Sequence, residues 1–155
     1  MQEYGVEMTD TEVAEFLTRQ GHGVLSFGGE EPYGLPISFG YDVVDNRCIF
    51  QLVSDADSKK EAALTESNRV NLVAYEWNDI DDWRSVIITG ELSPIPDDSI
   101  EAVDAASIFA EYASVTSLTV FDESLSELTV VWHELDIAEM TGRQSPTVTK
   151  NKLED

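Results

Sequence analysis

Positively charged residues are scarce in this sequence. Lysine and arginine together number 9 in 155 residues, against 31 aspartates and glutamates, so the formal net charge is -22. A field of this sign repels phosphate backbones and anionic lipids, which disfavours nucleic acids and anionic membranes as partners. The acidic residues are spread along the whole chain, and a Debye length of about 3 Å at 1 M salt screens their repulsion. We therefore expect a halophile's protein whose surface is adapted to high salt.

Cysteine, histidine and long apolar runs are also scarce. The single cysteine, Cys48, excludes a disulfide within the chain, fits a reducing compartment, and lies in an apolar run typical of a buried hydrophobic residue. With only His22 and His133 beside it, a zinc site is disfavoured, and we expect His133 to be a half-exposed strand residue. The polar, acidic N-terminus and the lack of a long apolar run predict a soluble, cytoplasmic protein without a signal peptide or membrane span.

The usual signatures of catalysis are missing as well. There is no Gly-x-Gly-x-x-Gly sequence and no P-loop, so no nucleotide site of either kind is indicated. Carboxylate pairs and serine–histidine–aspartate combinations occur by chance in a chain this acidic, and they carry no information. The sequence therefore assigns no catalytic residue, and no metal is expected.

What the chain does contain is enough apolar sequence for one core. Hydrophobic residues make up 42% of the 155 residues, which indicates one folded domain rather than an acidic disordered chain. Thr9 and Glu12 form a capping box that opens a helix, and Gly21 closes that helix. Further helices are expected at 58–66 and 97–113, and strands at 22–27, 33–41, 47–53, 70–77, 83–92 and 128–137.

Short strands at short intervals predict a small barrel or sandwich of mainly antiparallel strands. Pro36 implies an edge position for the second strand, because proline has no amide hydrogen to donate. The segment 114–127 stays unassigned, and residues 141–155 are expected to be polar and frayed. We place the domain at residues 1–142 and a flexible tail at 143–155.

A cluster of cations stands out against the acidic background. Lys59 and Lys60, two of the nine cations, sit side by side behind Ser58. Charge-assisted hydrogen bonds from lysine and serine are a common way to hold a phosphate. The alternative is that both lysines are solvated residues early in a short helix, and residue position alone does not choose between the two.

Five segments in this order carry a resemblance to a known family. They are residues 36–41, Ser58-x-Lys60, Leu64, residues 68–70, and the run from Trp83 to Gly90. The pattern resembles the FMN-binding split β-barrel proteins related to pyridoxamine 5′-phosphate oxidase, and it is most similar to their branch that includes nitroimidazole-resistance proteins. The resemblance runs from about Met8 to Gly142 and implies a mainly β fold with flanking helices, a six-stranded antiparallel Greek-key split barrel.

The resemblance also implies a homodimer that binds FMN in grooves at the dimer interface. Carried over by position, Ser58 and Lys60 would hold the FMN phosphate with help from Lys59, and Arg84 and Ser85 would complete the anion site. The backbone of Pro36, Ile37, Ser38 and Phe39 would run along the isoalloxazine edge, and Gly40 would allow the chain to approach the ring closely. Trp132 would cover the flavin from the partner subunit, although core packing accounts for it equally well.

The implied function is an FMN-dependent oxidoreductase that passes electrons from a nicotinamide to a small acceptor, with the cofactor supplying the redox chemistry. The alternatives are a flavin-binding module without turnover, and a split barrel that binds heme, deazaflavin or a protein. Two departures from the family's sequence pattern narrow the choice of function. Gln51 stands where the nitroimidazole branch often has a histidine, and the arginine- and histidine-rich substrate site of true pyridoxamine phosphate oxidases has no counterpart, which disfavours vitamin B6 oxidation.

Overall fold

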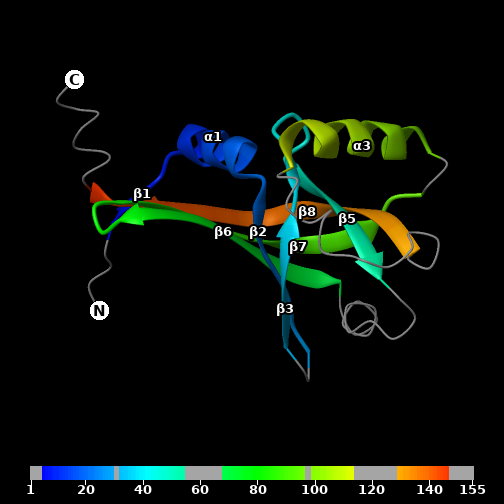
Figure 1. Ribbon diagram of the computed structural model, residues 1–155, viewed down its shortest axis with the longest axis horizontal. Coiled ribbons are helices and arrows are strands. Elements are labelled where there is room, and N and C mark those ends of the chain that lie inside the picture. Colours follow the sequence, from blue (N-terminus) through cyan, green and yellow to red (C-terminus); the bar gives the residue numbers. More distant parts are fainter. Residues whose placement is uncertain (1–4, 30–31, 55–67, 97–98, 114–128, 147–155) are drawn as a thin grey trace.

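One curled antiparallel sheet forms the body of the protein, and both described helices lie on the same side of it (Figure 1). The computed structural model describes residues 5–29, 32–54, 68–96, 99–113 and 129–146. The sheet has eight strands in the order β3-β2-β6-β7-β8-β5-β4, with β1 paired to β8. Their bounds are Val6–Glu7 (β1), His22–Phe27 (β2), Tyr33–Ser38 (β3), Gly40–Asp42 (β4), Arg47–Ser54 (β5), Arg69–Asp79 (β6), Asp82–Pro94 (β7) and Thr129–Gln144 (β8). This arrangement confirms the predicted split β-barrel fold.

The strand count differs from the predicted six for two reasons: the short strand β1 was not predicted, and the expected strand 33–41 is divided. The division falls at Phe39, whose backbone N–H donates to the Gly21 carbonyl at 2.9 Å in register with the β2–β3 pairs. Before that point the chain pairs with β2, and after it with β5. The chain thus crosses from one half of the barrel to the other within one residue, and a single predicted strand becomes β3 and β4.

The last strand is longer than predicted. Residues 141–155 were expected to be frayed, and for residues 141–144 that prediction is wrong, because β8 continues to Gln144, which pairs with Val6 on one side and Arg84 on the other. Gln144 and Ser145 are buried. The strand therefore runs two residues past the predicted domain end at 142, while residues 147–155 lie outside the described part of the chain.

The first helix, α1 (Asp10–Gln20), follows its sequence signals closely. The capping box is present, with the Glu12 N–H donating to Thr9 Oγ1 at 3.2 Å and the Thr9 N–H donating to Glu12 Oε1 at 3.0 Å. Gly21 ends the helix with a φ of 67°, a left-handed conformation that glycine adopts at little cost. Val13, Phe16 and Leu17 are buried against the sheet, as the spacing predicts.

The second described helix, α3 (Ile100–Tyr112), closes the other end of the barrel over β4 and β5. Ser99 caps it by accepting a hydrogen bond from the Ala102 N–H at 3.1 Å. Its small residues Ala102 and Ala105 are the buried ones, which lets the helix approach the strands closely. The helix predicted at 58–66 lies outside the described residues.

The core has two parts. The larger lies between α1 and the inner face of the sheet, and the smaller lies under α3 around Ile49 and Ile95. Cys48 is fully buried in the larger part, which confirms the prediction for it. His133 is only 8% exposed, so the prediction of a half-exposed histidine is wrong: β8 directs this side chain to the inner face, opposite Phe50 on β5.

Candidate functional site

The segment predicted to run along a flavin forms the outermost strand of the described sheet. Among the strands that the structure describes, β3 pairs only with β2, through pairs such as Val24 with Pro36 and Gly23 with Ile37. This confirms the edge position that Pro36 predicts. A strand bound on one side directs alternate backbone N–H and C=O groups away from its neighbour, where a planar polar ligand can reach them.

At the end of this segment, Phe39 and Gly40 pack against other parts of the same protein. Phe39 is fully buried, with its ring centroid 6.2 Å from that of Phe50. A Cβ on Gly40 would lie 2.8 Å from the Ile108 carbonyl oxygen of α3, so the close approach that this glycine allows is to a helix and not to a ring. Packing against α3 thus accounts for Gly40, and its approach to a flavin ring stays a prediction.

Trp132 packs within the subunit. Its ring meets Phe109 of α3 edge-on, with centroids 5.3 Å apart and planes at 71°, and it sits across the ladder from Gln51. It also lines a shallow groove of about 430 Å³ along α3 with Ala102, Val103, Ala106, Ser107 and Ala110. Core packing thus accounts for this tryptophan, and covering a flavin stays a prediction.

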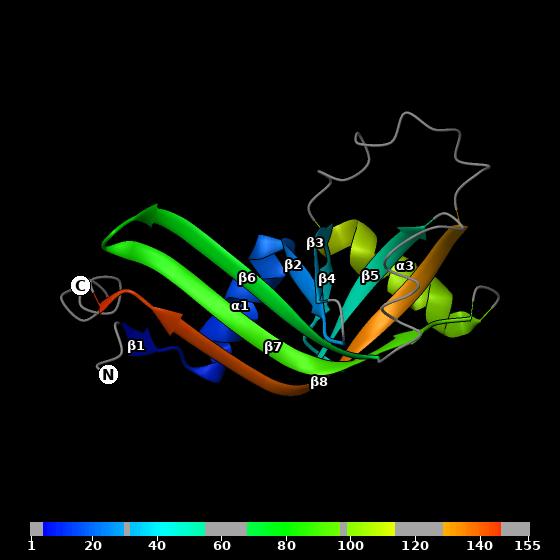
Figure 2. The ribbon, with the colours of Figure 1, turned by 90° about the horizontal axis from the view of Figure 1, so that it is seen from below.

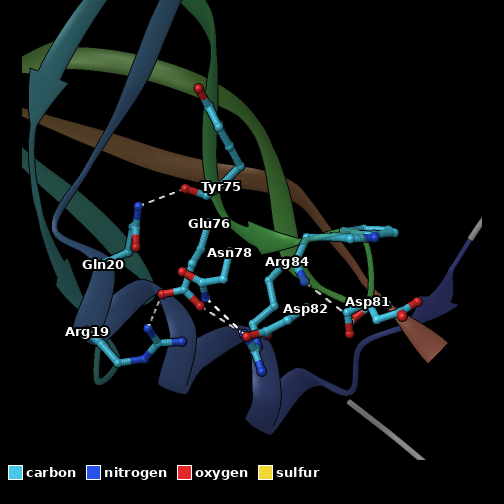
Figure 3. Close-up of polar contacts among 10 residues, drawn as sticks. Arg19, Gln20, Tyr75, Glu76, Asn78, Asp81, Asp82 and Arg84 are labelled. Carbon is cyan, nitrogen blue, oxygen red and sulfur yellow. Dashed lines mark hydrogen bonds and ion pairs between the residues drawn. The ribbon is translucent and has the colours of Figure 1, made fainter. Parts of the chain in front are cut away.

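Arg84 is held in a bridge of charges between β6, β7 and α1 (Figure 3). Its Nη1 donates to Glu76 Oε1 at 2.8 Å and lies 3.4 Å from Asp82 Oδ1. The other oxygen of Glu76 accepts from Arg19 Nη1 at 2.7 Å. Arg84 Nη1 therefore neutralises carboxylates of its own subunit, and the predicted contact of Arg84 with a phosphate stays a prediction.

The Ser85 side chain lies on the opposite face of the sheet from Arg84. Arg84 faces the α1 side of the sheet, whereas Ser85 pairs with Tyr75 and Arg143 and faces outward, because successive strand residues alternate between faces. Within one subunit the two side chains do not converge on one anion. Ser58, Lys59 and Lys60 lie outside the described residues, so their phosphate role stays a prediction.

Sequence reasoning missed a second arginine centre, around Arg47 at the start of β5. This side chain is only 12% exposed, and it contacts Asp42 at 3.0 Å and Glu134 at 2.7 Å. Burial by itself lowers the Arg47 pKa, but the hydrogen bonds and negative charges of Glu134 and Asp42 together raise it. Glu134 is 87 positions away in sequence, so no local pattern could have revealed the pair; its effect is to fix the β4–β5 turn against β8.

The described titratable groups in the interior do not form a catalytic centre. Burial raises the pKa of the Cys48 thiol, and burial lowers the pKa of His133, whose Nδ1 lies 3.3 Å from the Val131 carbonyl. Burial, followed by the nearby Cys48 and Asp42, raises the pKa of Tyr41, whose hydroxyl donates to Asn46 at 2.7 Å. Within the described ranges, no three His, Cys, Asp or Glu side chains are grouped to hold a metal ion. No helix in that part of the chain has the length and apolar character needed to cross a membrane.

A broad groove of about 820 Å³ lies between α1 and the β4–β5 turn. Its floor is largely apolar, from Ala14, Tyr41 and Met140, and its rim carries Asp10, Glu15 and Arg19. None of the residues predicted for the cofactor lines it.

Solved structures share this fold at low sequence identity. A FAD-binding protein from Mesorhizobium loti matches with a TM-score of 0.68 and 21% identity, covering 90% of this chain and 97% of its own. A candidate 5-nitroimidazole antibiotic resistance protein from Bacteroides thetaiotaomicron matches with a TM-score of 0.65 and 15% identity, covering 90% and 86%. A FAD and heme binding protein from Mycobacterium smegmatis matches with a TM-score of 0.63 and 15% identity, covering 89% and 72%. At these identities the similarity concerns the fold alone.

No curated protein matches the sequence. The family model of pyridoxamine 5′-phosphate oxidase matches residues 9–144, from the N-cap of α1 to the last residue of β8. The match thus takes in both described helices and seven of the eight strands, all but β1. This chain belongs to the pyridoxamine 5′-phosphate oxidase family.

Proposed function

We propose that this protein binds FMN as a homodimer and is an oxidoreductase that passes electrons from a nicotinamide to a small acceptor. When bound, the flavin supplies the redox chemistry, and the protein supplies binding, orientation and electrostatics. This division of labour is consistent with the described interior, where His133 and Cys48 are core residues and no acid–base pair is assembled.

The observation that carries the proposal is the edge position of β3. The isoalloxazine ring presents carbonyl and imide groups in a row, and a strand edge presents backbone donors and acceptors in a row at matching height. Pro36 is exposed at this edge, and Phe39 anchors the end of the strand through the Gly21 carbonyl and the Phe50 ring. The residues present in β3 therefore fit the ring that the family resemblance implies.

The charges of the described residues support Ser58, Lys59 and Lys60 as the phosphate site. A phosphate monoester carries between about 1.5 and 2 negative charges, and the rest of the protein is strongly negative. Arg19, Arg47 and Arg84 are each bound to carboxylates of the same subunit. A phosphate site therefore needs cations outside these pairs to counter the negative potential of the protein. Lys59 and Lys60, which are adjacent in sequence, would supply them.

The second candidate is a binding protein without turnover, for a flavin, heme or deazaflavin. The similarity of the fold to that of the Mycobacterium smegmatis FAD and heme binding protein favours this alternative. The two candidates differ in one property, because only the oxidoreductase consumes a nicotinamide.

The test is an absorbance spectrum of protein purified in molar salt, recorded before and after addition of FMN, FAD or heme and desalting. Retained flavin bands with FMN, followed by NADH oxidation by the loaded protein, are the expected result. Retained flavin without NADH oxidation would favour the binding protein. A colourless protein that retains none of the flavins would overturn the proposal.

A further inference from the structure

We propose that the groove between α1 and the β4–β5 turn binds a small organic cation with an apolar body, of the aryl-alkyl ammonium class. The groove measures about 820 Å³, within the range of roughly 300–1,000 Å³ that is usual for small-molecule sites. None of its lining residues is among those predicted for the cofactor, so the inference goes beyond the proposed function and does not depend on it. Figure 2 shows β6, β7 and β8 in front of both described helices, which places the groove on the helix side of the sheet.

Apolar side chains from both walls and the floor line the groove. Ala14 of α1, Tyr41 of β4 and Met140 of β8 are joined there by Val43 of the β4–β5 turn. Val43 is 61% exposed, in a chain that has 31 acidic residues with which to cover its surface. Removing this side chain from water is favourable, so the groove favours a ligand that brings an apolar body into contact with it.

Two hydroxyl groups that line the groove have already donated their hydrogen atoms within the protein. The Tyr41 hydroxyl donates to Asn46 Oδ1 at 2.7 Å, and the Thr18 hydroxyl donates to the Ala14 carbonyl at 2.7 Å. Each hydroxyl oxygen is therefore left with acceptor lone pairs and no hydrogen to offer a ligand. An ammonium group, which carries only N–H donors, complements such oxygens.

The charges at the rim also favour a cation. Asp10 and Glu15 line the groove, and no ion pair joins either carboxylate to another residue in the part of the chain that the structure describes. Arg19, the cation among the lining residues, donates to Glu76 Oε2 at 2.7 Å, so that carboxylate offsets its charge (Figure 3). The rim therefore keeps two carboxylates to attract a positively charged ligand.

Helix geometry places these two carboxylates on either side of the groove-facing row of α1. With 3.6 residues per turn, Thr11, Ala14 and Thr18 form one row along the helix. Asp10 lies to one side of this row and Glu15 to the other. A cationic group at either border of the row can therefore meet a carboxylate while the apolar body of the ligand covers the small side chains between them.

Both walls of the groove are fixed by contacts within the fold. An ion pair at 2.7 Å ties the end of α1 to β6. Arg47 contacts Asp42 at 3.0 Å and Glu134 of β8 at 2.7 Å, which holds the turn against the sheet. Asn46 adopts a left-handed φ of 52°, a conformation that asparagine tolerates, and accepts the Tyr41 hydroxyl. A ligand therefore enters a preformed site and does not have to order it.

The experiment is a titration of the whole chain in molar KCl, without added flavin, with naphthalene probes of similar size. Naphthylmethylamine is a cation at neutral pH, naphthylmethanol is neutral and naphthoate is an anion. Molar salt shortens the Debye length to about 3 Å, so it screens the general attraction of a net charge of -22 for cations and leaves direct contacts. Methionine methyl groups labelled with carbon-13 report the location by NMR, because Met140 lines the groove whereas Met8 is buried in the core.

We expect the amine to shift the Met140 methyl resonance and to bind about tenfold more tightly than the alcohol, with the anion weakest. The double variant Asp10→Asn with Glu15→Gln should weaken amine binding by about tenfold and leave alcohol binding unchanged, because it removes two contacts to the charge and keeps the shape. Val43→Ser should weaken the amine and the alcohol alike. The matched control is Glu101→Gln, which removes the same charge at an exposed position on α3 and should change neither affinity.

Equal affinities for the amine and the alcohol would overturn the inference, and this comparison needs no variant. Equal losses of amine binding in Glu101→Gln and in the double variant would also overturn it, because the attraction would then come from the whole protein. A Met140 resonance that the amine does not move would overturn the location. A Met140 resonance that shifts with protein concentration in the absence of a probe would assign the groove to a second copy of the chain and contradict the proposed ligand.

Discussion

At the scale of single residues, three of the nine cations, Arg19, Arg47 and Arg84, form ion pairs with carboxylates, and two more, Lys59 and Lys60, are adjacent in sequence. Arg47 and Arg84 are largely buried and satisfied by carboxylates, so their guanidinium groups serve the fold. Losing one partner of such a pair leaves an uncompensated charge, which costs far more than losing a surface pair. Lys59 and Lys60 are the adjacent cations on which the proposed phosphate site rests.

Lys60→Ala is expected to weaken FMN binding by about tenfold or more, because it removes a charge-assisted hydrogen bond to the phosphate. The affinity is measured by quenching of flavin fluorescence in molar salt. Arg19→Ala is the control, since Arg19 is half exposed at the end of α1 and binds Glu76. Equal affinities for Lys60→Ala and the wild type would remove the phosphate assignment.

His133 is expected to make stability depend on pH. Burial lowers its folded-state pKa below the ordinary 6.5, so the unfolded chain binds more protons than the native state between those two values. The contribution of neutral His133 is therefore complete above about pH 6.5 and is lost as the pH falls through the folded pKa. Urea midpoints at about pH 7.5 and 5.5 should fall less between the two for His133→Gln than for the wild type. The same drop in both proteins would show that this histidine does not contribute.

At the scale of elements, contacts between helices and strands account for residues that the sequence analysis placed beside a flavin. Gly40 makes room for α3, Trp132 packs on Phe109, and Phe39 joins the two halves of the sheet. The β3 edge is what remains available for binding. Among the described residues predicted for the cofactor, the backbone of β3 therefore stays the part proposed to contact the flavin ring.

Gly40→Ala is expected to destabilise the protein by about 1–3 kcal/mol, because the new methyl group would overlap the α3 backbone. Gly34→Ala on β3 is the matched control, since its methyl group would lie 3.6 Å from Val24 Cγ1, an ordinary contact. Chemical denaturation of the flavin-free proteins measures both changes. If Gly40→Ala kept full stability and lost only flavin affinity, the glycine would serve the ring after all.

At the scale of the whole molecule, charge sets the conditions under which the fold and the dimer are stable. A net charge of -22 on 155 residues favours expansion at low salt, and screening removes that penalty. Stability is therefore expected to rise with salt.

The melting temperature is expected to rise by several degrees between about 0.1 M and molar KCl, over which the Debye length shrinks from about 10 Å to 3 Å. Differential scanning calorimetry at constant pH measures the rise. A melting temperature that stays flat or falls over this range would count against adaptation of the surface to high salt.

Local signals in the sequence determined much of the fold. The capping box at Thr9, the glycine stop at Gly21, the edge position of Pro36 and the burial of Cys48 all follow from properties of a few neighbouring residues. The ordered segments were also enough to indicate the family. These features could be predicted because their causes lie within a turn or a strand of the chain.

Other features were decided only by tertiary structure. The length of β8 depends on its pairing with β1 and β7, and the split at Phe39 depends on the change of pairing partner from β2 to β5. Whether His133 is buried, and whether Arg84 binds a carboxylate or a ligand, depends on partners far away in sequence. Hydrophobic periodicity identifies that a residue is apolar or that a strand has two faces, but it does not say which face another element will cover. For that physical reason only the tertiary structure decided that α1 covers the face of the sheet that carries Leu72, Ala74 and Val86, and leaves Tyr75 and Ile87 exposed on the other.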